Sequence, residues 1–489
     1  MLSHLVNRLS DYYILTLPLF VVLVYFLLSA QRSSRIKPFP GPPFRFPNGQ
    51  GTEKFFSGRN AARRWRNSYG SIYSIWSGFK REVVITKPEH VQAFYKDSHN
   101  HIKASDNNAG WLFGELLGSC VGVVSQKRWV RVRAPFEHHF TRPASLKRSL
   151  LFLNESRVFL QSMNKENNST TINVTDDLKY CPFFMVASIF FGPLSAAQRH
   201  EIYMIGPLRE VLFRDAFSGG VNRYSFAKYL PGSAMPKLRE FQRRWEDFVK
   251  RSHDEATLNS GGAIVSLWET VERGGLSKEE KQLLQTLDES LFANLDVTAH
   301  ALSWAMLRIA HHTSTQHDVR QEIGANSHSE EDYEEYLRQD NTLLAACILE
   351  SSRLHPILLL TAFSNPESAL TDKTVGDFKI LRNTDVIVDS YAINVDNAYW
   401  EDSTIFNPRR HLGQRDQSRR YNMWRFGFGP RQCLGKNVAD IILRVIVAEM
   451  VRCYRIDIIG KGGIDGIELQ ADSWIGLPEC MVKLTPHTG

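Results

Sequence analysis

The sequence predicts a mainly α-helical protein with a smaller β region and an N-terminal transmembrane helix. Three observations lead to this prediction. An uncharged and mostly apolar run covers residues 12–30, and apolar and polar residues alternate over residues 71–86. From about Val91 onward, helical periodicity dominates the chain.

The apolar run from Tyr12 to Ala30 is long enough for a helix that spans roughly 30 Å of hydrocarbon. A cleaved signal peptide is the alternative, but the run exceeds a usual signal core and no small-x-small cleavage site follows it. Three basic residues lie in 32–37, whereas only Arg8 precedes the run, so the positive-inside tendency places the rest of the chain in the cytosol. We expect a single-pass membrane protein, in the endoplasmic reticulum, whose large domain faces the cytosol.

Three segments follow from this: an anchor over residues 1–31, a basic and proline-rich hinge over 32–46, and one large folded domain over 47–489. The prolines of the hinge fix φ and cannot continue a helix. The acidic segment 326–335 lacks periodicity, and we expect an exposed connection there. It is a poor domain boundary, because helical patterns resume at once from Tyr336.

Within the large domain, the alternation over residues 71–86 predicts a β-hairpin. Leucines at helical intervals predict a helix from Lys281 to His311, long enough to cross an entire domain. Further helices are predicted over residues 343–354 and 438–451. Strand-like segments return at residues 378–381, 385–388 and 480–484.

Composition and charge narrow the class of function. The chain has 43% hydrophobic and 23% charged residues, which is typical of a globular protein, and its net charge is +7. No basic block with interleaved aromatic residues appears, so we expect no nucleic-acid partner. The six cysteines are scattered without a CxxC pair, which favours a reducing compartment over a disulfide framework or a zinc site.

A cysteine in a glycine-rich loop is the strongest chemical signal. The segment Phe-Gly-Phe-Gly-Pro-Arg-Gln-Cys-Leu-Gly covers residues 426–435, directly before the predicted helix 438–451. Glycines allow tight turns and a close approach to a flat ligand, and backbone N–H groups can hydrogen-bond a thiolate. The positive end of the helix should lower the pKa of Cys433. A buried free cysteine in an ordinary turn is the alternative.

This loop resembles the haem-binding signature of the cytochrome P-450 family, Phe-Gly-x-Gly-x-Arg-x-Cys-x-Gly. The six positions of that signature are matched by Phe426, Gly427, Gly429, Arg431, Cys433 and Gly435. The resemblance implies the P-450 fold, with haem iron bound by the Cys433 thiolate and a haem propionate contacted by Arg431. Haem bound by cysteine thiolate favours O–O bond cleavage.

Two further segments resemble elements of the same family. Glu350 and Arg353 are spaced i, i+3 on a predicted helix, where they can pair, and Arg410 lies in a segment like the family's Phe-x-Pro-x-Arg. The resemblance implies that these three side chains form a buried structural network. Trp129 and Arg133 match a Trp-x-x-x-Arg element whose side chains reach a propionate. An ordinary core tryptophan beside a solvated basic face is the alternative reading of the latter pair.

The oxygen-activation motif departs from the family pattern. Residues 293–298, Ala-Asn-Leu-Asp-Val-Thr, have Asn294 where a glycine is usual and Val297 where a threonine is usual. Asp296 and Thr298 remain as the candidate catalytic groups of the proton relay that the resemblance implies. On an ideal helix Thr298 is rotated by about 100° from Val297. An exposed helical charge is the alternative for Asp296.

Several apolar segments are candidate substrate walls by their positions. Many family members have a basic residue for a propionate shortly after the Glu-x-x-Arg helix, but residues 357–365 contain none and are mostly apolar. The other candidates are Trp111 to Phe113, the helix around Leu291 and Asn294, and Trp474 with Ile475.

The resemblance implies a monooxygenase that inserts oxygen from O2 into a small, largely apolar substrate, with electrons from an NADPH-dependent flavoprotein reductase. An acidic reductase surface would suit the basic residues around the cysteine loop, which are Arg415, Arg419, Arg420, Arg425 and Lys436. Residues 291–304 resemble the same helix in fungal secondary-metabolite enzymes, including those that act on cyclic-dipeptide scaffolds. A haem-thiolate isomerase or dehydratase, and a non-catalytic membrane-tethered haem protein, are the alternatives.

Overall fold

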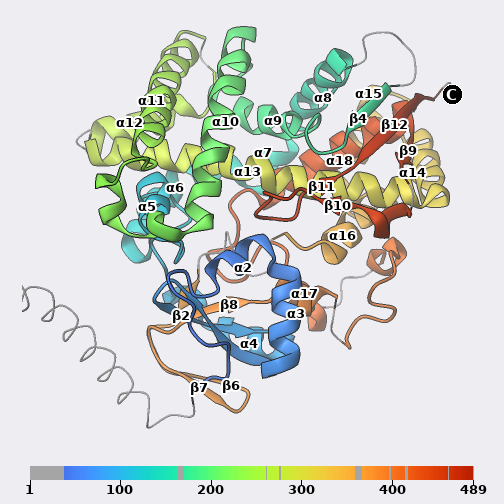
Figure 1. Cartoon of the computed structure of the whole chain (residues 1–489). Coiled ribbons are helices and arrows are strands. Elements are labelled where there is room, and N and C mark those ends of the chain that lie inside the picture. Colours follow the sequence, from blue (N-terminus) through green and yellow to red (C-terminus); the bar gives the residue numbers. More distant parts are fainter. Residues whose placement is uncertain are drawn as a thin grey trace, which may run out of the picture.

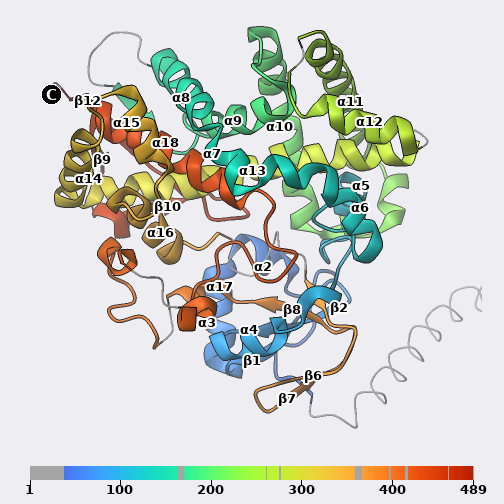
Figure 2. The same ribbon diagram turned by 180° about the vertical axis from the view of Figure 1, so that it is seen from behind.

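The computed structural model describes residues 38–163, 170–259, 261–274, 277–357, 366–395, 398–413, 417–460 and 462–487. A large helical part lies against a smaller β-rich part, and the two are seen from opposite sides in Figure 1 and Figure 2. The predicted mainly α fold with a smaller β region is therefore confirmed. The predicted anchor, residues 1–31, lies outside the described residues, as do residues 32–37 of the hinge.

A five-stranded sheet forms the centre of the β-rich part. Its strand order is β1-β2-β8-β5-β3, so strands from the two halves of the chain lie side by side (Figure 1). The predicted hairpin is β1 with β2, and its register pairs Ile72 with Ile85. Gly78, in the turn between them, has a φ of +58°, which favours glycine. The bounds are β1 Ile72–Ser77, β2 Lys80–Ile85, β3 Ile102–Lys103, β5 Glu367–Ser368 and β8 Asp385–Val388.

The remaining strands form small sheets. A three-stranded antiparallel sheet, β4-β12-β9, joins Thr170–Asn173, Met481–Pro486 and Tyr454–Ile459 beside the helical part. Two short ribbons are β6 Lys373–Val375 with β7 Phe378–Ile380, and β10 Glu468–Leu469 with β11 Pro478–Glu479. The strands predicted at residues 378–381, 385–388 and 480–484 are therefore confirmed within a residue or two.

Four helices accompany the sheet of the β-rich part, and the others build the helical part (Figure 1). The first group is α2 Gly51–Phe56, α3 Gly58–Tyr69, α4 Pro88–Tyr95 and α17 Ser390–Asn394. The second group is α5 Trp111–Leu117, α6 Gln126–Glu137, α7 Arg142–Leu146, α8 Ser149–Met163, α9 Tyr180–Phe191, α10 Ala196–Ser218, α11 Met235–Leu258, α12 Ile264–Gly274, α13 Ser277–His311, α14 Thr313–Ala325, α15 Glu330–Arg338, α16 Leu343–Leu354 and α18 Lys436–Cys453.

The longest described helix, α13, crosses the helical part and contacts α9, α12, α16 and α18. It contains the predicted helix 281–311 and begins four residues earlier. Nearly every residue of its neighbour α9 is buried, because that segment is apolar on all sides. The helices predicted at 343–354 and 438–451 are confirmed as α16 and α18.

One prediction about the helical part was wrong. Residues 326–335 were expected to form an exposed connection, but α15 begins at Glu330. The Ser329 hydroxyl caps the helix by accepting a hydrogen bond from the N–H of Asp332, and three acidic residues in the first turn suit the helix dipole. The side chains of Tyr333 and Tyr336 are buried, so α15 has an inward face. The periodicity of the sequence did not reveal this face.

Within the described ranges, no single helix has the length and apolar composition needed to cross a bilayer, and only the bent pair α9 and α10 passes that test together.

Candidate active site

The loop over residues 426–435 is folded by two tight turns that require glycine. Gly427 and Gly429 have φ values of +77° and +76°, in the left-handed region that other residues rarely adopt. A Cβ on Gly429 would also overlap with the Ser98 hydroxyl. The loop closes when the N–H of Cys433 donates to the carbonyl of Phe426 at 3.0 Å. It ends at Gly435, the N-cap residue of α18.

The Cys433 side chain faces an internal cavity. Phe426, Gly427 and Gly435 of the same loop line that cavity beside it. Cys433 is exposed, yet it is surrounded by protein, because the surface it exposes is that of the cavity. The apolar walls come from several elements and include Val121, Val186, Val297, Ala301, Leu434 and Ile442.

The electrostatics of Cys433 differ from the prediction. Burial raises the pKa of its thiol, and a hydrogen bond from the backbone N–H of Gly435 acts in the opposite direction without cancelling it. The net direction is therefore upward, opposite to the one expected from the position at the start of α18. A metal ion bound to the sulfur would favour the thiolate.

Trp129, Arg133 and Arg431, which the sequence selected together, lie close to one another and line the cavity. The guanidinium carbon of Arg133 lies 5.2 Å from the centroid of the Trp129 ring, and that of Arg431 lies 5.1 Å from it. Arg133 donates to the carbonyl of Gln432 at 3.1 Å, and Arg431 donates to the carbonyl of Val124 at 2.6 Å. Burial lowers the pKa of Arg431 to about 10, so it stays charged near neutral pH.

These residues fit haem. A thiol, two guanidinium groups and an indole ring all line one largely apolar cavity, and haem propionates need cations such as these. The buried Nε of Arg431 has no hydrogen-bond partner among the described residues, which suits a donor aimed at a carboxylate. Cys433 would bind the iron, and Trp129, Arg133 and Arg431 would hold the propionates.

Sequence reasoning missed one cation at this site. Lys103, in β3, lines the cavity and lies 3.4 Å from the Glu367 carboxylate of β5. His101 contacts the same carboxylate at 3.3 Å. Burial acts to raise the pKa of Glu367, but Lys103 and His101 outweigh it and lower that pKa. No motif marks Lys103, because only the pairing of two short strands far apart in sequence brings it to the cavity.

The candidate relay residues of α13 lie in two different places. Thr298 lines the cavity together with Val297, whereas Asp296 is not among the lining residues. The Asp296 carboxylate accepts a hydrogen bond from the Trp474 indole N–H at 2.7 Å, and burial raises its pKa to about 6. The exposed-charge reading of Asp296 is therefore wrong. The side chain of Asn294 lies outside the described part.

Beyond Asp296, a charged pair leads toward the surface. Lys179 Nζ lies 3.0 Å from the Glu210 carboxylate, and both side chains are partly exposed. Both groups also influence the pKa of Asp296, Glu210 by raising it and Lys179 by lowering it. Asp296 thus lies between the cavity-lining turn of α13 and an ion pair that reaches solvent.

Only some of the residues that the sequence analysis selected as substrate walls line the cavity. Of segment 357–365, only Ile357 lies inside the described ranges, and it lines the cavity. Phe113 and Trp474 instead pack with Phe213 and Phe217 in a buried aromatic cluster, with ring centroids 4.8 to 6.0 Å apart. Trp111, Leu291 and Ile475 do not line this cavity. Glu289 and Ser290, which the sequence analysis did not select, do line it.

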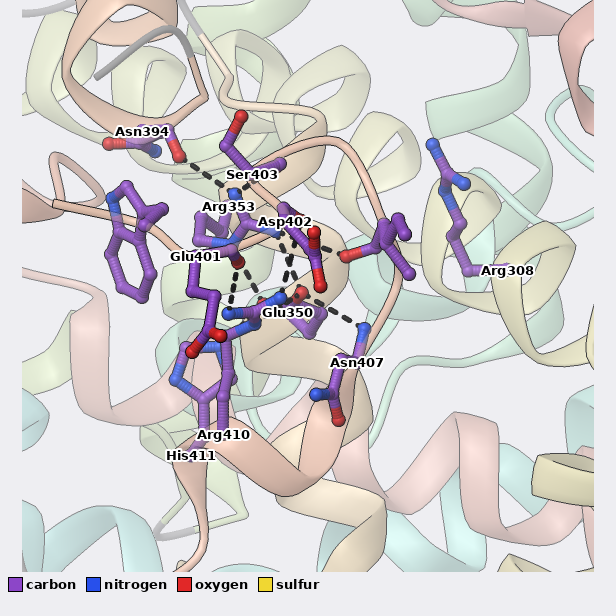
Figure 3. Close-up of polar contacts among 12 residues, drawn as sticks. Arg308, Glu350, Arg353, Asn394, Glu401, Asp402, Ser403, Asn407, Arg410 and His411 are labelled. Carbon is purple, nitrogen blue, oxygen red and sulfur yellow. Dashed lines mark hydrogen bonds and ion pairs between the residues drawn. The ribbon is translucent and has the colours of Figure 1, made fainter. Parts of the chain in front are cut away.

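The predicted network of Glu350, Arg353 and Arg410 is present and fully formed (Figure 3). Arg353 donates two hydrogen bonds of 2.8 Å to the Glu350 carboxylate, and Arg410 Nε donates to it at 3.0 Å. His411, which was not predicted, contacts the same carboxylate at 2.7 Å. Burial acts to raise the pKa of Glu350, but the hydrogen bonds from Arg353 and His411 outweigh it and lower the pKa to about 2.

The basic residues around the cysteine loop do not all form an exposed surface that a reductase could bind. Arg420 is exposed, but Arg425 pairs with Asp440 at 2.6 Å and Lys436 donates to Gln432 at 2.9 Å. Arg415 and the side chain of Arg419 lie outside the described part.

Comparison with known proteins identifies the family. The family model described as Cytochrome P-450 matches residues 40–479. Cytochrome P-450 monooxygenase verC of Clonostachys rogersoniana is 63% identical over 447 residues, which cover 91% of this chain and 88% of the relative. Cytochrome P-450 monooxygenase gliC of Aspergillus fumigatus is 46% identical over 465 residues, covering 92% and 89%. Cytochrome P-450 monooxygenase aclC of Aspergillus oryzae is 40% identical over 455 residues, covering 91% of each.

The cysteine loop, the residues that would hold the propionates, the Glu350 network and these relatives agree, and the chain belongs to the cytochrome P-450 family.

Proposed function

We propose that this protein is a haem-thiolate monooxygenase of secondary metabolism that oxidises a cyclic-dipeptide scaffold. One observation carries the proposal: Cys433 faces the same cavity as Trp129, Arg133 and Arg431. The relatives named monooxygenases match almost the whole length of the chain, which supports the same reaction class here.

The haem, when bound, supplies the activation of O2 with electrons from a redox partner. The protein supplies position and electrostatics. Cys433 would bind the iron, and the apolar side chains of Val186, Val297 and Ala301 exclude water from the cavity that they line. Arg133 and Arg431, which line the same cavity, would fix the orientation of the propionates.

Protons reach the cavity by way of Asp296 in this proposal. Its pKa of about 6 lets the carboxyl gain and lose a proton near neutral pH. The partly exposed ion pair of Lys179 and Glu210 lies on the outer side of Asp296, and Thr298 offers a hydroxyl on the cavity side. Because Asp296 does not line the cavity itself, a short movement of its side chain, or a water molecule between Asp296 and Thr298, completes the proton path.

The isomerase alternative makes a different prediction about electrons. A monooxygenase consumes NADPH and O2 in step with product when a flavoprotein reductase is present, whereas an isomerase or dehydratase needs neither. The test is to incubate the haem-loaded protein with reductase, NADPH and O2 and to follow all three together with product. Product formation that continues without NADPH would contradict the proposal.

The cyclic-dipeptide substrate rests on the resemblance of residues 291–304 to the same helix in enzymes that act on such scaffolds. The apolar walls of the cavity suit a compact and weakly polar ring. Accurate-mass comparison of metabolites from cells with the active chain and with a Cys433→Ala chain tests the assignment. A product 16 mass units heavier than a cyclic dipeptide is expected only with the active chain. A product derived from another scaffold would contradict it.

A membrane location is also part of this proposal, as a single-pass protein of the endoplasmic reticulum whose catalytic domain faces the cytosol. A row of aromatic rings, of which Phe79 and Phe226 are exposed and Phe44 and Tyr224 are half-buried, supports it. Phe79, in the turn after β1, stacks on Phe44 at 5.4 Å, and its ring centroid lies 6.0 Å from that of Tyr224. Phe226 extends the row at 5.7 Å, and it is 52% exposed.

The position and charge of this row fit a lipid surface. Phe44 lies in the predicted hinge, the segment that follows the predicted anchor. Tyr229 is 79% exposed, and the exposed Lys80 and Lys228 flank the rings. Aromatic rings at headgroup depth with adjacent lysines are typical of surfaces that contact anionic lipid. The electrons would come from an NADPH-dependent flavoprotein reductase in the same membrane.

A further inference from the structure

The two carboxylate oxygens of Asp296 have different surroundings. The indole N–H of Trp474 donates to Oδ2 at 2.7 Å. Within the described residues, no side chain and no backbone N–H donates a hydrogen bond to Oδ1. Asp296 directly precedes Val297 and Thr298, which line the cavity. This difference between the oxygens therefore occurs one residue away from the cavity wall.

Trp474 is carried by a tight turn between β10 and β11, and this ribbon lies against α13 (Figure 1). The Ser473 hydroxyl accepts from the N–H of Leu477 at 2.8 Å, and the N–H of Gln470 donates to the carbonyl of Leu477 at 2.9 Å. The indole ring stacks on Phe217, with the ring centroids 5.1 Å apart. The backbone of the turn and the packing of the ring together fix the direction of the indole N–H.

The charged groups that face Asp296 do not replace this donor. Three of them influence its pKa: Lys179, which precedes α9, and Arg209 and Glu210 of α10. Lys179 Nζ donates to the Glu210 carboxylate at 3.0 Å. Arg209 Nε donates to the Asp288 carboxylate at 2.7 Å. In the part of the chain that the structure describes, the indole N–H is thus the one hydrogen-bond donor to the Asp296 carboxylate.

We propose that Trp474 is a positioning residue of the proton path, which assigns the transferable proton of Asp296 to Oδ1. An indole N–H can donate a hydrogen bond but cannot accept one. Oδ2 must therefore stay an acceptor whether the carboxyl is charged or neutral, and the proton of the neutral form lies on Oδ1. The O–H bond that forms on proton uptake and breaks on delivery is always the one at Oδ1. This inference rests on the proposed function, because it specifies how Asp296 acts within the proposed relay.

A fixed proton position matters because Asp296 reaches the cavity only indirectly. The cavity is lined by Thr298, the next member of the proposed relay, and not by Asp296. If either oxygen could carry the proton, only part of the molecules would hold it in the geometry needed for transfer. A fixed O–H presents the same geometry in every cycle. Loss of the indole N–H should therefore impair proton delivery and leave haem binding intact.

The first test observes the proton directly, from the infrared carbonyl band of the neutral Asp296 carboxyl in the haem-loaded full-length chain in detergent. The band is the difference between spectra at about pH 5 and about pH 8, on either side of the pKa of about 6, and its loss in Asp296→Asn assigns it. In Trp474→Phe the band should move to higher frequency, because the carbonyl oxygen Oδ2 loses its hydrogen bond. It should also appear at a pH about one unit higher, since that hydrogen bond favours the charged form.

Trp304→Phe is the matched control for this substitution. The indole N–H of Trp304 donates at 3.5 Å to the carbonyl of Gly476, in the same turn, and not to Asp296. The control should leave the frequency and the pH midpoint of the band unchanged. If Trp474→Phe fails to retain haem, Ser473→Ala replaces it. That variant keeps the indole but loosens the turn, so it should move the band in the same direction by a smaller amount.

The second test measures product formed per NADPH consumed, with a flavoprotein reductase and cyclo(L-Phe-L-Phe) as the probe. Trp474→Phe should lower this ratio several-fold in the wild-type background. It should have no further effect in the Asp296→Asn background, because the proton that it positions is then absent. An equal loss in both backgrounds would overturn the inference, since Trp474 would then act only through packing.

The outcomes distinguish this inference from the function on which it rests. An unchanged carbonyl band in Trp474→Phe overturns the role of Trp474 and leaves the proposed function standing. A wild-type chain that forms no product from the probe overturns the cyclic-dipeptide assignment, whereas the infrared band still decides which oxygen carries the proton. Unchanged coupling in Asp296→Asn removes Asp296 from the proton path, and Trp474 with it.

Discussion

At the scale of single residues, the sulfur of Cys433 gives the most direct test of the site. Cys433→Ala removes the only described thiol that lines the cavity, so the reduced carbon-monoxide complex should lose the red-shifted Soret band of thiolate ligation. The reduced-minus-oxidised difference spectrum in carbon monoxide measures this. Cys453→Ala, at the far end of α18 and away from the cavity, should keep the band. A normal band in Cys433→Ala would refute the ligand assignment.

Asp296 and Thr298 form the second residue-scale prediction. Asp296→Asn and Thr298→Val should each uncouple NADPH consumption from product formation. The double variant should be little worse than the worse single variant, because the effects of substitutions within one relay are not additive. Haem content should stay intact in all three. We expect Asp296→Asn to slow turnover more strongly, since water can replace a hydroxyl more easily than a buried acid. Unchanged coupling in both single variants would favour the isomerase alternative.

The raised pKa of Asp296 also predicts an effect on stability. The folded-state pKa is about 6 against an ordinary 3.8, so ionisation opposes folding, and stability falls as pH rises through this interval. Asp296→Asn removes the buried charge and keeps an acceptor for the Trp474 N–H. It should therefore stabilise the protein by on the order of 2 kcal/mol at pH 8 and by little at pH 4. Thermal unfolding at both pH values measures this, and an equal effect at the two would contradict the assignment.

At the scale of elements, the Glu350 network joins α16 to the segment that carries Arg410 and His411 (Figure 3). Glu350→Gln should destabilise the protein by about 3–5 kcal/mol, because it leaves buried guanidinium groups without their charge partner. The measurement is denaturant unfolding at pH 7. Glu269→Gln, which breaks an exposed pair with Arg273 on α12, should change stability by less than about 1 kcal/mol.

The pH dependence of this network has the opposite sign to that of Asp296. Because the folded-state pKa of Glu350 is lowered from 4.5 to about 2, its contribution to stability is present above pH 4.5 and is lost as pH falls toward 2. The difference between the wild-type chain and Glu350→Gln should therefore shrink in acid. A difference that stays constant down to pH 3 would show that the carboxylate charge is not what stabilises the network.

Element boundaries show where single-sequence patterns are sufficient. Helix α16 was predicted with both ends correct, because its apolar run is bounded by the Thr342 cap and by the residue before Pro356. Helix α15 was missed because its first turn is acidic and polar. Its two tyrosines bury a face only after α8 and α18 pack against it.

At the scale of the whole molecule, deletion of residues 1–31 tests the proposed membrane location. Much of the truncated protein should leave the membrane fraction while its haem content is kept, because the described domain has its own core. Ultracentrifugation and the haem spectrum measure the two effects. Phe226→Ser and Tyr229→Ser in the truncated chain should release the remainder, if the exposed aromatic row contacts lipid. Loss of haem on truncation would show that the N-terminal segment is needed for the fold.

The sequence by itself determined the family and three members of the Glu350 network, and it selected Cys433 as the residue that would bind haem iron, because those residues occur in short motifs. His411 lies outside these motifs and was found only in the structure. It also determined the long helix and the hairpin, whose periodicities are local.

Only the tertiary structure decided which side chains share the cavity. Lys103 and Glu289 reach it through strand pairing and the packing of α13 on segment 115–122, and neither contact leaves a local pattern. Asp296 turns to Trp474, 178 residues away in sequence, so its burial and its pKa could not be derived from α13 alone. Burial and pairing depend on residues distant in the chain, and for that reason the charge state of a side chain is a property of the fold.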